Sequence, residues 1–304
     1  GREEALPTPA RPYDAPRLSP DGLRLASSIQ RGSGQDLWVY DVATGAGLRL
    51  TEDDEQNWIP VWAPDGRSIY FSSTKDAPRP DSYRGNLWYG NLYSVPADGS
   101  GAAVRLDITE DNQVITSVTP DGRMLLYSNV VDNNSLWEIM TVPSDWSTDP
   151  VALISGPSRR GSADISPDGR WLAYRSDESG VWEIYVQPYP GPGAKVAVSI
   201  GGGVQPVWSS SGRELFYRGA DGMMMAATIT GEGTPIVSER TPLFSTASYR
   251  AEQGQRLYHV APDGRFLLMR RPGTSASGDA EASAPQITVV LNWFEELRER
   301  VPTN

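Results

Sequence analysis

A short turn motif recurs along the whole chain and sets its architecture. Five copies read Ser, Ala or Thr followed by Pro-Asp-Gly, and a sixth reads Ser-Ser-Ser-Gly. The copies lie at residues 19–22, 63–66, 119–122, 166–169, 209–212 and 261–264. Their third positions are 44, 56, 47, 43 and 52 residues apart, which is the length of a four-stranded propeller blade with variable loops. We therefore predict a single domain over residues 1–304, an all-β propeller with six blades.

Each copy of the motif has the residues of a tight hairpin turn. Proline presets φ at the first turn position, aspartate accepts hydrogen bonds from nearby amides, and glycine takes the left-handed conformation that follows. Because the turn explains every residue of the motif, we interpret its aspartates as structural and not catalytic.

Strand patterns surround each turn. An apolar segment precedes the turn, as in 59–62, and a second follows it, as in 68–71. A third segment carries aromatic or large apolar residues, as in 136–139, and a fourth ends the repeat, as in 48–51. The 30 Gly, 25 Pro, 10 Trp and 13 Tyr fit many short strands with tight turns. Each repeat is predicted to be one antiparallel blade of four strands.

The two ends of the chain complement each other. The sixth repeat supplies only three strands, expected at 257–260, 265–269 and 287–291. Segment 5–8 lies where a fourth strand would precede the first repeat, so we expect it to pair with the last blade and close the ring. A short C-terminal helix is expected from Asn292, ending before Pro302.

Composition excludes several functional classes. A net charge of −11 provides no basic field for phosphates, so nucleic acid is not an expected partner. With no Cys and one His, disulfides, thiol catalysis and the usual zinc sites are excluded. No apolar run approaches the roughly 20 residues that span a bilayer, so no direct membrane insertion of this segment is expected.

No cofactor is expected, with one alternative open. Acidic clusters at 52–55, 110–111 and 132–134 offer the oxygen ligands that calcium prefers, but none has the spacing of a known calcium loop. They are interpreted as solvated loop charges, and a calcium ion in these loops or in the channel is the alternative.

The repeat resembles a known family. Its Trp-Ser/Ala-Pro-Asp-Gly core, followed by an aliphatic-aromatic strand, resembles the TolB-like, WD40-like β-propellers of bacterial envelope proteins. Segments 17–22, 166–180, 213–217 and 287–297 resemble the C-terminal propeller of bacterial membrane-anchored serine/threonine kinases. In that family a cytoplasmic kinase, a membrane helix and an extracytoplasmic propeller share one chain. The resemblance implies a sensor domain in the periplasm or at the cell surface.

Kinase elements are missing from the sequence. It has no Gly-rich loop, no His-Arg-Asp catalytic loop and no Asp-Phe-Gly, so a kinase domain would lie upstream. We therefore expect this segment to be no enzyme itself, but a sensor or scaffold that binds a protein or a small-molecule ligand.

The candidate ligand-binding residues come from one face of the disc. Connections between the second and third strands, and between the fourth strand and the next blade, lie opposite the Pro-Asp-Gly turns and are irregular. Exposed aromatic and arginine side chains dominate interface energetics, which makes those on this loop-rich face the candidates. They are Trp58, Arg79, Tyr83, Arg84, Arg160, Tyr249 and Arg250. The alternative for each of these side chains is that it packs over a blade edge.

The single histidine does not indicate catalysis. His259 lies four residues before Asp263, where the other repeats place Arg17, Val61, Ser117, Asp164 and Val207. We expect it to line the channel or a blade interface in a structural role, because one His without a paired nucleophile makes no triad.

Three alternatives stay open. The segment could be the propeller half of a prolyl-oligopeptidase-like peptidase, although it has no Gly-x-Ser-x-Gly nucleophile elbow. It could be a lyase or hydrolase that uses carboxylates in the central funnel. It could also be a purely structural oligomerisation module.

Overall fold

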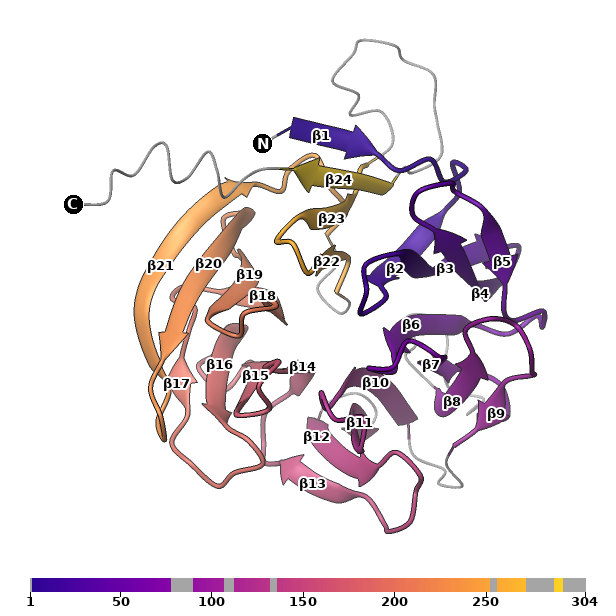
Figure 1. Cartoon of the computed structure of the whole chain (residues 1–304). Coiled ribbons are helices and arrows are strands. Elements are labelled where there is room, and N and C mark those ends of the chain that lie inside the picture. The colour runs from indigo at the N-terminus through magenta and orange to yellow at the C-terminus, as the bar shows by residue number, and fades with distance from the viewer. Residues whose placement is uncertain are drawn as a thin grey trace.

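Six four-stranded antiparallel sheets surround a central axis (Figure 1). The computed structural model describes residues 2–77, 90–106, 112–131, 136–251, 256–271 and 287–291. Over these residues the predicted six-bladed propeller is confirmed.

The inner strand of each blade comes first in five blades, and the chain then runs outward. Blade 1 contains β2 (Tyr13–Leu18), β3 (Arg24–Arg31), β4 (Gly34–Asp41) and β5 (Gly47–Arg49). Blade 2 contains β6 (Asn57–Trp62), β7 (Ser68–Ser73), β8 (Asn91–Pro96) and β9 (Val104–Arg105). Blade 3 contains β10 (Asn112–Val118), β11 (Met124–Val131), β12 (Leu136–Pro143) and β13 (Val151–Ile154).

The second half of the ring repeats this order. Blade 4 contains β14 (Arg160–Ile165), β15 (Trp171–Ser176), β16 (Glu183–Pro188) and β17 (Val196–Ala197). Blade 5 contains β18 (Gly203–Trp208), β19 (Glu214–Gly219), β20 (Met223–Thr230) and β21 (Ile236–Ser245). Blade 6 contains β22 (Tyr258–Val260), β23 (Phe266–Met269), β24 (Ile287–Leu291) and, from the other end of the chain, β1 (Arg2–Ala5).

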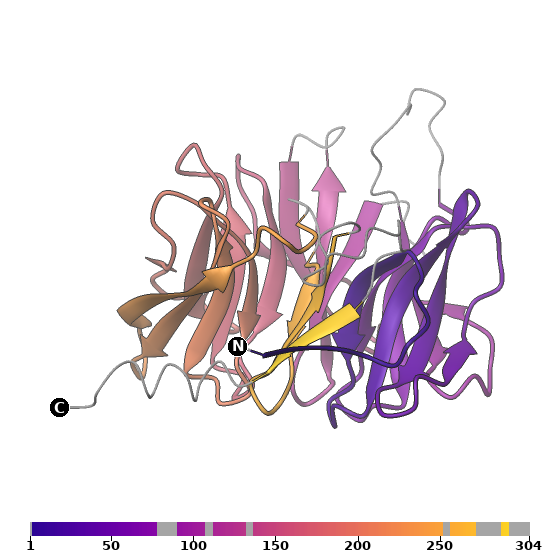
Figure 2. The same ribbon diagram turned by 90° about the horizontal axis from the view of Figure 1, so that it is seen from above.

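The N-terminal strand closes the ring, as predicted, but from an earlier position. Strand β1 pairs with β24 from Arg2 opposite Leu291 to Ala5 opposite Thr288, and both views of the ribbon show the two strands side by side (Figures 1 and 2). The expected strand at 5–8 is therefore placed three residues too late. Leu6 still donates its amide to the Ile287 carbonyl at 3.1 Å, but Pro7 has no N–H to continue the ladder.

The expected C-terminal helix falls on residues that the structure does not describe, from Asn292 onward. Throughout the described ranges the regular elements are strands. Within those ranges, no helix has the length and apolar character of a membrane span.

The turn motif folds as its chemistry predicts. In the first copy the Gly22 amide donates to the Ser19 carbonyl at 2.8 Å, and Gly22 has a φ of 73°. Ser19 Oγ donates to Asp21 Oδ1 at 2.5 Å, and so does the Leu23 amide at 3.0 Å. In the degenerate copy at 209–212, Ser211 Oγ replaces the aspartate carboxylate as the hydrogen-bond partner of Ser209 Oγ and of the Arg213 amide. The hydroxyl accepts the same backbone bond, which explains why this repeat survives without aspartate.

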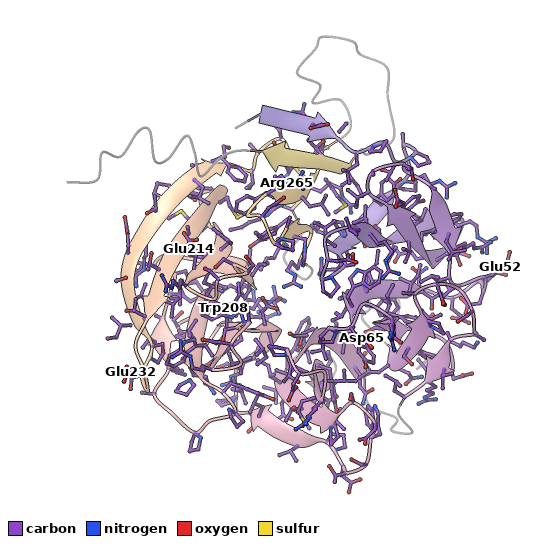
Figure 3. All side chains as sticks on the ribbon, in the orientation of Figure 1. Glu52, Asp65, Trp208, Glu214, Glu232 and Arg265 are labelled. Atoms are coloured by element: carbon purple, nitrogen blue, oxygen red, sulfur yellow. The ribbon has the colours of Figure 1, made fainter. Side chains whose placement is uncertain are left out.

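The hydrophobic core lies between neighbouring blades. Phe216 of blade 5 and Phe266 of blade 6 meet edge to face with ring centroids 5.0 Å apart. Similar clusters join blade 1 to blade 2 and blade 3 to blade 4. Figure 3 shows Glu52 and Glu232 on the outer rim of the disc and Trp208 nearer the axis. The ring therefore buries apolar surface between blades and leaves its inner edge to form a site.

Candidate functional site

A cavity of about 250 Å³ lies on the axis of the propeller. All six inner strands contribute to its wall, through Arg17, Val61, Ser117, Asp164, Val207 and His259. These are the positions that the repeat aligns, and the prediction that His259 lines the channel or a blade interface is confirmed for the channel. Residues of four Pro-Asp-Gly-type turns also line the cavity, including Ser19, Pro167, Ser209 and Pro262. The cavity therefore opens on the turn face of the disc.

A recurrent bulge shapes the inner strands. Ala15, Ile59, Ser162 and Gln205 have positive φ values of 46°, 54°, 53° and 60° at equivalent positions in blades 1, 2, 4 and 5. The pairing register of each inner strand with its neighbour shifts at that point. Such a bulge bends the strand and changes where the following side chains point. In each case the channel-lining residue follows two positions later.

Sequence reasoning missed these bulges, although a signal was present. Pro16, Pro60 and Pro206 stand in the middle of three inner strands. Proline is confined to edges, strand starts and bulges within a sheet, because it cannot donate to the ladder. A proline inside an inner strand, directly after the residue with positive φ, is therefore the sequence mark of this bulge.

Arg17 forms part of the floor of the cavity. Its side chain is almost fully buried, and Nη1 donates to the carbonyls of Pro16 at 2.8 Å and Arg256 at 2.9 Å. Among the described residues its Nε has no hydrogen-bond partner. Burial, followed by the nearby charge of Arg256, lowers the pKa of Arg17 well below its usual value. The guanidinium is therefore buried beside a second arginine, and the nearby carboxylates of Asp164 and Asp14 offset this effect only in part.

An ion pair crosses the channel beside Arg17. Arg256 Nη1 lies 3.2 Å from Asp164 Oδ1, and both side chains are mostly buried. Asp164 Oδ2 accepts the Trp208 amide at 3.0 Å. Because Asp164 belongs to blade 4 and Arg256 directly precedes β22 of blade 6, the pair bridges blades that are not adjacent. Arg17 and Arg256 also line a second cavity of about 30 Å³, so they separate it from the larger one.

Tryptophans hold the charged channel residues in position. Trp62 Nε1 of blade 2 donates to the Arg17 carbonyl of blade 1 at 3.0 Å. Trp208 Nε1 of blade 5 makes the equivalent bond to the Asp164 carbonyl of blade 4 at 3.2 Å. Each bond fixes a channel residue to the next blade, so the geometry of the cavity depends on the closed ring.

His259 lies in the same cavity without a catalytic partner. Burial lowers the pKa of His259 well below its usual value, and the charges of Arg256 and Arg17 lower it further. The imidazole is therefore neutral near pH 7. Its Nδ1 has no hydrogen-bond partner within the described ranges. These residues provide no paired nucleophile and base.

A third buried arginine adds to the positive charge. Arg218 of β19 is almost fully buried, with its Cζ 5.7 Å from the ring centroid of Tyr258. Its three guanidinium nitrogens have no hydrogen-bond partner in the described part of the chain, and burial lowers its pKa to about 10. The Tyr258 hydroxyl donates to the Gln205 carbonyl at 2.7 Å and is under the electrostatic influence of Arg218, Arg256, Asp164 and Arg17. The inner ring is thus cationic in a protein of net charge −11.

Three candidate residues of the loop-rich face are buried. Trp58, Arg160 and Tyr249 are each less than 9% exposed. Arg160 Nη1 donates to the carbonyls of Gly156 and Ser158, at 3.1 and 2.9 Å. The expectation that these three side chains are exposed is therefore wrong, because each packs at the end of an inner strand or under a loop.

Two of these residues tie the closing segments together. Tyr249 donates its hydroxyl to Glu3 Oε1 of β1 at 2.5 Å. Arg250 is partly exposed, and its Nη1 donates to the Tyr13 carbonyl of blade 1 at 2.6 Å. Arg79, Tyr83 and Arg84 lie outside the described residues, so their role in binding stays a prediction.

No candidate metal centre occurs among the described residues, because no three His, Cys, Asp or Glu side chains gather there as ligands would. The acidic clusters at 110–111 and 132–134 lie outside those ranges, so the calcium alternative stays a hypothesis.

Comparison with known proteins agrees with the geometry of the blades. Residues 10–148 match the family model of the TolB β-propeller domain, PD40. The match covers just under half of the chain and shows a similarity to TolB β-propeller domains. The matched segment contains all of blades 1 and 2 and three strands of blade 3, and the structure continues the same repeat around the ring.

Two curated relatives match part of the chain. The uncharacterized peptidase YuxL of Bacillus subtilis is 22% identical over 205 residues, which covers 56% of this chain and 31% of the relative. The uncharacterized protein Atu1656 of Agrobacterium fabrum is 25% identical over 164 residues, covering 51% of this chain and 52% of the relative. The chain thus spans about a third to a half of the curated relatives it matches.

Solved structures share the fold. A TolB-like protein from Agrobacterium tumefaciens superposes with a TM-score of 0.63 at 18% identity, covering 93% of this chain and 91% of that one. A prolyl endopeptidase superposes with a TM-score of 0.54 at 14% identity, covering 93% of this chain and 43% of the peptidase. At these identities the likeness shows the fold alone.

Proposed function

We propose that this TolB-type propeller is a non-catalytic binding module that holds a protein segment or a small molecule at its central channel. One observation supports it above the others. The cavity receives a side chain from every blade, and two of its polar groups, Arg17 Nε and His259 Nδ1, have no partner among the described residues. Buried polar groups normally have hydrogen-bond partners, so unpaired ones in a cavity mark a place for a ligand. Binding by Arg79, Tyr83 and Arg84 on the opposite, loop-rich face remains a separate proposal.

The test is binding without turnover. The purified propeller is screened against a panel of small molecules and against envelope extract, with melting temperature and capture as readouts. Val207→Phe narrows the cavity, and Val181→Phe makes the same change at an exposed site. We expect Val207→Phe to lose binding while Val181→Phe binds like the parent. Equal binding by both variants would place the site elsewhere, and turnover of a bound molecule by the propeller alone would refute a non-catalytic role.

The native context proposed for this module is the extracytoplasmic part of a membrane-anchored serine/threonine kinase. The resemblance of segments 17–22, 166–180, 213–217 and 287–297 supports it. The full-length gene product is the test. A kinase domain with His-Arg-Asp and Asp-Phe-Gly, followed by a membrane helix upstream of this segment, is the expected result.

A second candidate is the propeller half of a peptidase. The similarity to YuxL, and the fold shared with a prolyl endopeptidase of which this chain covers 43%, favour it. The same full-length sequence decides between the two, because a Gly-x-Ser-x-Gly elbow in a fused domain indicates a peptidase. Peptide hydrolysis by that longer protein would establish the second candidate and remove the kinase context.

A further inference from the structure

We propose that the channel recognises a single carboxylate on an apolar body, with the carboxylate bound at Arg17 and Arg256. This inference rests on the proposed function, because it names the ligand chemistry of the same cavity. The shared chemistry covers two sources: a small apolar acid, and the C-terminal residue of a peptide that enters from the turn face.

The charge balance of the inner ring supports an anion. Arg17, Arg218 and Arg256 all act electrostatically on Tyr258, and among the described residues Asp164 is the carboxylate that does so too. Asp14 also influences Arg17, but Arg250 Nη2 lies 3.6 Å from Asp14 Oδ1. Positive charge is thus in excess where it is most buried, and a buried charge without a partner is costly. An anion at the floor of the cavity satisfies that excess.

The walls support an apolar body. Apolar and polar side chains share the wall of the cavity. Val61 and Val207 give it aliphatic surface, and Ser117, Ser19 and Ser209 add hydroxyl groups. A free inorganic anion leaves the aliphatic surface unused, whereas an acid with a hydrocarbon or aromatic body contacts it while its carboxylate reaches the floor. This arrangement of one charged end and partly apolar sides is typical of selective ligand sites.

The size of the cavity limits the ligand. A volume of about 250 Å³ lies near the lower end for small-molecule sites, which begin at about 300 Å³. That space fits one amino-acid residue or a small organic acid. The cavity opens on the turn face and ends at the arginines, so the carboxylate enters first.

His259 supplies a neutral polar contact on the wall. A neutral imidazole carries one donor and one acceptor nitrogen, and Nδ1 is the one without a partner within the described ranges. Asp164 already engages Arg256. A ligand with one carboxylate can bind Arg17 and Arg256 together with Asp164. A ligand with several negative charges would place additional negative charge next to Asp164 and is disfavoured.

Calorimetric titration with matched probes tests the inference on the intact propeller. The probes are a Leu-ending tripeptide with a free C-terminus, the same peptide amidated, 4-methylpentanoate, and inorganic phosphate. We expect the free acid to bind at least about tenfold more tightly than the amide, because a hydrogen bond to a charged group contributes about that factor to affinity. If only the peptide acid binds, the source is a chain end; if 4-methylpentanoate binds as well, a small acid suffices. Equal binding of free acid and amide, tighter binding of phosphate, or no binding of any probe would overturn the inference.

Two variants locate the contact. Arg17→Gln removes one guanidinium of the floor, and Arg170→Gln removes an exposed one that pairs with Asp168 on the same face. We expect the first to weaken free-acid binding about tenfold or more and the second to leave it unchanged. Equal effects of the two substitutions would refute binding at the floor. Should Arg17→Gln fail to fold, the free-acid and amide comparison on the parent still decides.

The single histidine gives an independent readout. His259 is the one His of the sequence, so labelled histidine yields one imidazole signal in NMR. A carboxylate at the floor offsets the field of Arg17 and Arg256, which should shift this signal and raise the pKa of His259. If acid and amide shift the signal equally, the channel binds ligands but does not select a carboxylate. If the acid binds without a shift, neither the inference nor the channel site holds.

Discussion

Two glycines with the same backbone conformation test how the ring is closed. Gly45, in the turn between β4 and β5, has a φ of 73°, and Gly169 of the fourth turn motif has a φ of 71°. An added Cβ at Gly169 meets no atom within 4 Å, whereas at Gly45 it would lie 2.2 Å from the Pro7 carbonyl oxygen. Alanine therefore produces the same conformational strain at both sites and a clash at only one.

The structure gives the expected loss of folding stability for each substitution. Left-handed strain costs an L-residue about 1 kcal/mol, which is the expected loss for Gly169→Ala. In Gly45→Ala the backbone of Pro7 must also move, since a carbonyl oxygen cannot turn away as a side chain does. That movement disrupts the Leu6 amide bond to Ile287, about 1 kcal/mol, and the packing of Leu6 on the core, about 1–2 kcal/mol. The total for Gly45→Ala is about 3–4 kcal/mol.

The assay is denaturant unfolding together with calorimetry. An unfolding entropy of about 2.1 cal/mol/K per residue over 304 residues converts 1 kcal/mol into roughly 1.6 °C. We expect Tm to fall by about 1–2 °C for Gly169→Ala and about 5–6 °C for Gly45→Ala. In a chain that lacks residues 2–8 the extra cost of Gly45→Ala should disappear, because the clashing backbone is gone. Equal losses in the full chain, or a persistent difference in the shortened one, would refute the reasoning.

Three further predictions concern closure and pH. Deleting residues 2–5 should lower Tm and promote aggregation, because it exposes the edge of β24 and leaves the buried Tyr249 hydroxyl without its acceptor; an unchanged Tm contradicts closure through β1. The hydrogen bond from the Thr119 hydroxyl lowers the pKa of Asp121 in the folded state. The ionised carboxylate therefore stabilises the fold above the unfolded pKa of about 3.8, and this stabilisation is lost as the pH falls through the folded pKa. Asp121→Asn should flatten this acid dependence of unfolding. Burial lowers the pKa of His259, so below about pH 6.5 the unfolded chain binds a proton that the folded chain does not. The free energy of unfolding should therefore decrease as the pH is lowered below that value, and His259→Gln should remove this pH dependence.

The fold was predictable because its signals are local and repeated. The sixth repeat was expected at 257–260, 265–269 and 287–291, and the strands lie at Tyr258–Val260, Phe266–Met269 and Ile287–Leu291. The turn chemistry of each motif involves residues within five positions of one another, so it does not depend on the rest of the protein. The position of β1 was misjudged because the effect of Pro7 on the strand ladder was not taken into account.

The site was less predictable because its contacts are not local. Tyr249 was expected to be exposed, but its hydroxyl bonds to Glu3, 246 positions away in the sequence. A loop sequence does not tell whether an aromatic residue points outward or packs under the next segment. The alignment of repeats did place His259 and Arg17 in one ring. Arg256 came from outside the aligned strand and Arg218 from the neighbouring strand, so only the folded structure brings them together.

The charge of the whole chain and that of its channel lead to different partners. The net charge of −11 argues against binding a polyanion on the surface. Inside the ring, however, Arg17, Arg218 and Arg256 act through low-dielectric walls and outweigh Asp164. Their field is confined to the cavity, while acidic side chains such as Glu52 and Glu232 lie on the outer rim (Figure 3). We therefore expect the outer surface to repel nucleic acids and other polyanions, and the cavity to select a ligand small enough to bring one negative charge inside.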